Sequence, residues 1–278
     1  MTPFFQLDPK IESASAAALQ QVAPRFTEID EVTEYNQLKV LRAFMDNGIS
    51  ERHFGSSTGY GYGDEGRETL DKVWAQVFGA EDALVRHNFT CGTHTLAVAL
   101  FGVLRPGDKM LCVSGMPYDT LHSVIGLTGE NMGSLKDYGI AFDCVPLKEE
   151  HLDYEAIAKA VDDTVTMVYI QRSRGYELRA SLSLEETQKV AEIAKEKNPN
   201  CIVMVDNCYC EFVNKQESTQ VGADLIAGSL IKNAGGMITG PFDSAVRSLL
   251  VGIIELGVEE VMVIGHNDCG VAQVNKQV

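Results

Sequence analysis

The chain has 278 residues, 45% of them apolar and 22% charged, which is typical of a globular protein and excludes a disordered chain. A formal net charge of −16 argues against binding to nucleic acid or to an anionic membrane surface. Seven cysteines, several of them inside apolar runs, indicate reduced thiols. The sequence shows neither a signal peptide pattern nor an apolar run of membrane-spanning length, so we expect a cytoplasmic protein.

Helices and strands are expected to alternate along the chain. Residues 8–48 have apolar side chains at helical spacing, and the glycine-rich stretch 53–66 that follows predicts a loop. Further helices are expected at 67–78, 88–104, 117–125, 154–161, 183–197 and 242–256. Strands are expected at 82–87, 110–113, 140–146, 166–170, 201–206, 224–228 and 258–264. This order predicts an α/β fold with a mostly parallel sheet that helices cover on both faces.

Lys232 is the residue around which we predict a functional site. It follows a short strand-like run and lies beside Ser229 and flexible glycines, where an amine can form an imine with an aldehyde cofactor. The strand 201–206 ends in Asp206. An imine-forming lysine, with an aspartate for the pyridinium nitrogen, is the minimal set for pyridoxal phosphate (PLP) chemistry. The alternative is a solvated surface lysine that follows a strand.

Two glycine-containing segments are candidates for binding the phosphate of such a cofactor. Cys91, Gly92 and Thr93 lie in a turn of small residues that opens a helix, where free backbone N–H groups favour an anion. Since ligands of parallel sheets bind at the carboxyl ends of the strands, this turn and Asp206 are expected at one edge. The 53–66 loop holds two tyrosines and is followed by an arginine, a composition that suits a phosphate or ring contact. The alternatives are a plain strand-to-helix turn and an ordinary loop.

Six motifs occur in a fixed order along the chain, at 59–67, 86–94, 117–121, 171–176, 206–212 and 228–232. With them, residues from about 10 to 233 resemble the aluminium-resistance, or methionine γ-lyase-like, family of fold-type I PLP enzymes. The resemblance implies a large PLP-binding domain and carbon–sulfur elimination on a sulfur amino acid, as in Cys/Met metabolism. The expected ligands are therefore PLP and a small-molecule amino-acid substrate.

The resemblance also implies a role for each candidate residue. Lys232 would hold PLP and then move the α-proton of the substrate, Asp206 would keep the pyridine nitrogen protonated, and Tyr118 would stack on the ring. The phosphate would be held by four residues of the same chain, which are Cys91, Gly92, Thr93 and Ser229. It would also be reached by Tyr60 or Tyr62, and by Arg67, of a neighbouring subunit. A homodimer or homotetramer is therefore expected.

A second set of motifs lies at 232–239, 243–250, 255–258 and 263–270. With them, residues from about 231 to 274 resemble the β-class carbonic anhydrases. That resemblance implies zinc bound by His266 and Cys269, and a fragment of an enzyme for reversible CO2 hydration. The third ligand of that family comes from a Cys-x-Asp-x-Arg strand, which this sequence lacks. A turn at a strand end, without metal, is the alternative reading of these two residues.

The two resemblances meet at 232–236, so we predict a chimera that is joined there. The expected parts are an N-terminal helical segment (1–50), a PLP-binding large domain (51–240) and a carbonic-anhydrase-like fragment (241–278). The first family usually carries the arginine for the substrate carboxylate in a C-terminal small domain, which the residues after Gly240 are too few to replace. Loss of turnover by truncation, or a non-catalytic relic, is therefore a further alternative.

Overall fold

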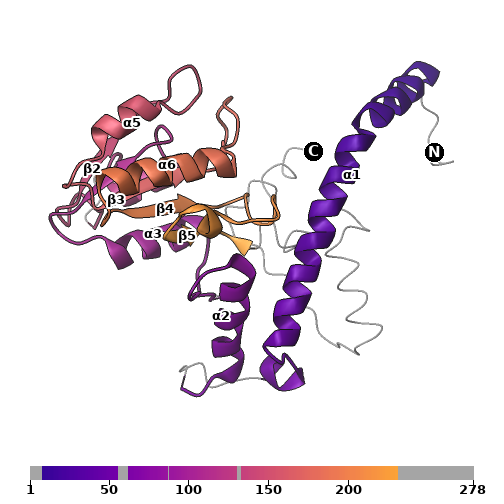
Figure 1. Cartoon of the computed structure of the whole chain (residues 1–278), viewed down its shortest axis with the longest axis horizontal. Helices are drawn as coiled ribbons and strands as arrows, with labels where there is room; N and C mark the ends of the chain where they lie inside the picture. The colour runs from indigo at the N-terminus through magenta and orange to yellow at the C-terminus, as the bar shows by residue number, and fades with distance from the viewer. Residues whose placement is uncertain (1–7, 56–61, 87, 130–132, 231–278) are drawn as a thin grey trace.

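The computed structural model describes residues 8–55, 62–86, 88–129 and 133–230 (Figure 1). Five strands form one parallel sheet in the order β2-β1-β3-β4-β5. The strands are β1 (Lys109–Cys112), β2 (Ala141–Cys144), β3 (Met167–Gln171), β4 (Ile202–Asp206) and β5 (Leu225–Ala227). At the carboxyl ends, Gln171 of β3 pairs in register with Asp206 of β4, which pairs with Ala227 of β5.

Helices cover both faces of this sheet. On one face lie α5 (Tyr154–Ala160) and α6 (Leu184–Lys197), and on the other lie α3 (Gly92–Val103) and α4 (Asp119–Ile125). Alternate residues of a strand enter the two cores, because successive side chains of a strand point to opposite faces. Within β3, Val168 and Ile170 join the α5–α6 core, whereas Met167 and Tyr169 join the α3–α4 core. The predicted α/β class and the two-sided helical cover are thus confirmed.

A pair of helices lies beside the sheet. The long α1 (Pro9–Asp46) contacts α2 (Glu65–Phe78), and Figure 1 shows the N-terminal part of α1 extending away from the sheet. Ala43 of α1 packs with Val73 and Val77 of α2 in a small third core. The short 3-10 helices η1 (Glu51–Phe54) and η2 (Ser218–Val221) complete the regular structure of the described residues. None of the helices in this part of the chain is both long enough and apolar enough to span a membrane.

Most predicted elements have the predicted type, with ends shifted by a few residues. The capping box that opens α6 is present: Ser183 Oγ accepts from the Glu186 N–H at 3.1 Å, and the Ser183 N–H donates to Glu186 Oε2 at 2.8 Å. The helix expected from residue 88 begins at Gly92. The expected helix 242–256 and strand 258–264 lie outside the described residues.

The strand predicted at 82–87 is wrong for its described residues, 82–86. A carboxylate of α2 accepts one backbone N–H of this segment and forms an ion pair with its last described residue. The Val85 N–H donates to Asp71 Oδ1 at 2.9 Å, and the guanidinium of Arg86 donates to both oxygens of Asp71 at 2.6 and 2.7 Å. The turn at residues 91–93 therefore opens a helix without following a strand.

Candidate functional site

Asp206 lies at the carboxyl end of β4, between β3 and β5, as predicted. It is only 4% exposed, and two donors hold its carboxylate: the Tyr169 hydroxyl at 3.1 Å from Oδ2 and the Cys208 N–H at 3.1 Å from Oδ1. Burial, followed by the charge of Asp206, raises the pKa of Tyr169 well above its ordinary value. The hydroxyl therefore stays protonated and remains a donor to Asp206.

Tyr118 lies at the same edge, in the segment that follows β1, and is the N-cap residue of α4. Its N–H donates to Gln171 Oε1 at 2.6 Å, and Gln171 is the register partner of Asp206. The ring of Tyr118 lies 5.8 Å from that of Tyr176, measured between centroids. Burial is the first cause that raises the pKa of Tyr118, so its hydroxyl also stays protonated. Gln171 thus links the positions of Tyr118 and Asp206.

The start of α3 is the place where the sequence predicts an anion site. Gly92 is its first helical residue and is buried, and Cys91 is its N-cap, with Sγ accepting from the His94 N–H at 3.3 Å. The Thr93 and Thr120 hydroxyls lie 2.7 Å apart, which ties the start of α3 to the first turn of α4. The first turn of α3 therefore lies close in space to the segment that carries Tyr118.

Ser229 follows β5 and is held by a residue that sequence reasoning did not single out. Its N–H donates to Glu211 Oε1 at 2.8 Å, and Glu211 is 3% exposed. Burial is the first cause that raises the pKa of Glu211 to about 7. Glu211 lies within the motif at 206–212, as Gln171 lies at the start of the one at 171–176, but their roles depend on tertiary contacts.

The remaining predicted site residues are not gathered at this edge by any described contact. Tyr62 is 91% exposed, and Arg67, in the first turn of α2, lies 3.5 Å from the carboxylate of Asp64. Their contact with a neighbouring subunit stays a prediction. Four residues lie outside the described part of the chain, which are Tyr60, Lys232, His266 and Cys269. Within 8–55, 62–86, 88–129 and 133–230, no three His, Cys, Asp or Glu side chains are grouped to hold a metal ion.

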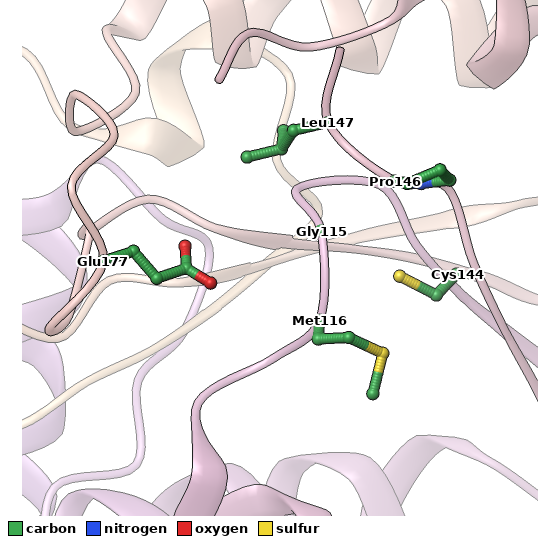
Figure 2. A pocket seen from close by; sticks show the side chains of 6 residues that line it. All are labelled: Gly115, Met116, Cys144, Pro146, Leu147 and Glu177. Atoms are coloured by element: carbon green, nitrogen blue, oxygen red, sulfur yellow. The ribbon is translucent and has the colours of Figure 1, made fainter. Parts of the chain in front are cut away.

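A separate, open pocket lies near the carboxyl ends of β1 and β2 (Figure 2). It has a volume of about 510 Å³ and is mostly apolar. Its lining residues are Gly115, Met116, Cys144, Pro146, Leu147 and Glu177. None of the predicted site residues lines it. We therefore define the candidate site by the hydrogen bonds around Asp206 and not by this pocket.

Comparison with known proteins gives the relatives of the chain. The family model described as methionine gamma-lyase matches residues 11–243. The uncharacterised protein YnbB of Bacillus subtilis is 49% identical over 211 residues, which cover 75% of this chain and 50% of YnbB. A carbon–sulfur lyase involved in aluminium resistance from Clostridium novyi, of known crystal structure, is 49% identical with a TM-score of 0.79. That match covers 83% of this chain and 55% of the lyase.

Two further facts come from these comparisons. Some curated relatives match most of this chain, and the chain spans about half of their length or less. It covers 50% of YnbB. A short segment is similar to YtiB of Bacillus subtilis, a protein named as a carbonic anhydrase candidate, with 48% identity over 48 residues, or 17% of this chain. Both predicted resemblances are therefore confirmed.

Proposed function

Because the chain belongs to the methionine gamma-lyase family, we propose that it carries the cofactor-binding part of a PLP-dependent carbon–sulfur lyase. The substrate class would be a sulfur amino acid. The observation that supports the proposal most is the carboxyl edge of the sheet, where Asp206 and Tyr118 are linked through Gln171. Ligands of parallel α/β sheets bind at such an edge.

The residues at this edge fit PLP. A buried carboxylate held by Tyr169 is suited to keep a pyridine nitrogen protonated, and Asp206 is 4% exposed. The N–H groups at the start of α3 and the Ser229 hydroxyl are suited to bind a phosphate, because a helix N-terminus favours an anion. Tyr118 offers an aromatic face. When bound, PLP supplies an electron sink that stabilises negative charge at the substrate Cα.

Residues of the chain itself would orient the site and move the proton. The Tyr169 hydroxyl would keep Asp206 oriented, because it donates to that carboxylate from a fully buried position. Gln171 fixes the backbone at Tyr118 through the 2.6 Å hydrogen bond. Lys232, outside the described residues, is the proposed anchor of the cofactor and the base that moves the proton at the substrate Cα.

The visible absorbance spectrum of the full chain tests this proposal. Titration with PLP should give a visible band in the wild type, and the Lys232→Ala variant should lose that band. The Lys197→Ala variant, changed at an exposed residue of α6, is the matched control and should keep it. A wild-type chain that takes up no PLP, or a band that survives Lys232→Ala, would contradict the proposal. Elimination from a sulfur amino acid is then measured as release of the thiol and of ammonia.

We also propose that the lyase assembles as a homodimer or homotetramer. Tyr62 is 91% exposed in the single chain, which leaves its ring available to a second copy. Light scattering on the purified chain measures its mass directly. A monomer at micromolar concentration would contradict this part of the proposal.

The alternative function is that of a zinc-dependent carbonic anhydrase fragment in a chain that joins parts of two families. The 48% identity with YtiB over 48 residues favours this alternative. Zinc bound to the full chain and lost on His266→Ala would support it. Stoichiometric PLP without zinc would favour the lyase, and neither ligand would indicate a non-catalytic relic.

A further inference from the structure

Glu211 is buried where the loop after β4 meets the segment after β5. Its Oε1 accepts the Ser229 N–H at 2.8 Å, and it also lies against Gly228. A Cβ at Gly228 would come 2.3 Å from Oε1, much closer than van der Waals contact allows. The φ angle of Gly228 is not in the left-handed region, so its backbone conformation does not require glycine. Glycine at this position therefore makes room for the carboxyl group of Glu211.

The loop that carries Glu211 has a strained backbone that two other elements hold in place. Tyr209 and Phe212 have φ angles of 67° and 62°, which side-chain-bearing residues rarely adopt. Asn36 of α1 donates to the Phe212 carbonyl at 3.0 Å. The Phe212 ring lies 6.0 Å from the ring of Trp74 in α2, measured between centroids. Since strain of this kind persists only where the surroundings fix it, α1 and α2 fix the position of Glu211.

We propose that Glu211 is a positioning residue, which holds the backbone of Ser229 so that the Ser229 hydroxyl can bind the cofactor phosphate. Gly228 leaves space for that carboxyl group, which a side chain at this position would displace. The inference deepens the proposed function and rests on it. Burial of a carboxyl group is costly unless a hydrogen bond offsets the cost, and the Ser229 N–H supplies one. Burial also raises the pKa of Glu211 to about 7, as expected of a carboxyl group that is enclosed by the protein.

A double-mutant cycle on the full chain tests the inference, with Glu211→Ala, Gly228→Ala and the double variant. The first measurement is hydrogen exchange of the backbone amides at 228–230 without added PLP. Each single change should speed this exchange by about tenfold or more, the factor expected for a lost hydrogen bond to a carboxyl group. The double variant should exchange no faster than Glu211→Ala, because the carboxyl group that the new methyl group meets is gone.

The second measurement is the affinity for PLP, from the visible band. Glu211→Ala and Gly228→Ala should each weaken it by about tenfold, and Glu211→Gln, which keeps an acceptor oxygen, should restore most of it. Gly102→Ala is the matched control, because the Cβ added at this position of α3 would meet no other part of the protein within 4 Å. It should change neither the exchange rate nor the affinity for PLP.

The inference would be overturned if the effects of the single variants multiply in the double variant, or if Glu211→Gln fails to restore PLP binding. Unchanged PLP affinity in Glu211→Ala would overturn it as well. A wild type that binds no PLP would instead refute the proposed function, and the exchange cycle would still decide whether Glu211 holds Ser229. Faster exchange in β3 as well as at 228–230 would point to general destabilisation and would also count against the inference.

Discussion

Replacing Glu211 by glutamine should make the stability of the protein less dependent on pH. Burial raises the pKa of Glu211 from 4.5 to about 7 in the folded chain, with the charges of Asp206 and Glu217 adding to the effect. Between these pH values the folded chain holds a proton that the unfolded chain has lost. The free energy of unfolding therefore falls as the pH rises from about 4.5 to about 7 and stays lower above that range. The difference amounts to roughly 3 kcal/mol, at about 1.4 kcal/mol for each pKa unit.

The glutamine variant lacks this titration, so its stability relative to the wild type should rise by roughly 3 kcal/mol between pH 4.5 and pH 8. Urea denaturation at several pH values measures both proteins, and the contributions of carboxyl groups that do not interact with Glu211 cancel in their difference. Glu196→Gln, at an exposed position of α6, is the matched control. A difference that stays constant over this range, or that grows toward low pH, would refute the reasoning.

Two further substitutions test the buried contacts around the site. Tyr169→Phe removes a donor to Asp206 from a fully buried position, so it should lower the free energy of unfolding by about 1–3 kcal/mol in urea denaturation; an unchanged transition midpoint would contradict this. Glu217→Ala leaves the partly buried ammonium of Lys39 without its counter-charge at 3.6 Å, removes the acceptor of the Phe212 N–H, and should cost about 1–3 kcal/mol by the same assay. Adding Lys39→Met to it should recover much of that loss, and a further loss would show that the charge is not the cause.

The parts of the site that the sequence predicts are those with a local signal. Asp206 ends an apolar run of strand type, and the start of α3 is a turn of small residues before a helical run. Both signals come from a few consecutive residues, since strand and helix patterns repeat over short distances. The placement of Asp206 at the sheet edge with Tyr118 then follows from the general rule for parallel sheets.

The parts that could not be predicted depend on contacts between distant residues. Glu211 and Ser229 are 18 positions apart, and Tyr169 and Asp206 are 37 apart, so no local pattern joins them. A tertiary contact can also accompany the absence of a predicted element, as the contact of Asp71 does. Its carboxylate accepts the Val85 N–H, within a segment of strand-like composition that is not a strand. A side-chain contact of this kind becomes visible only once the helices are packed.

The contact between α1 and the loop after β4 has a consequence for synthesis of the protein. Asn36 donates to the carbonyls of Phe212 and Asn214, which are 176 and 178 positions further along the chain. A ribosome therefore releases α1 long before its acceptors exist, since chains emerge from the N-terminus first. The strained loop therefore acquires its contact with α1 only after most of the described chain has been made.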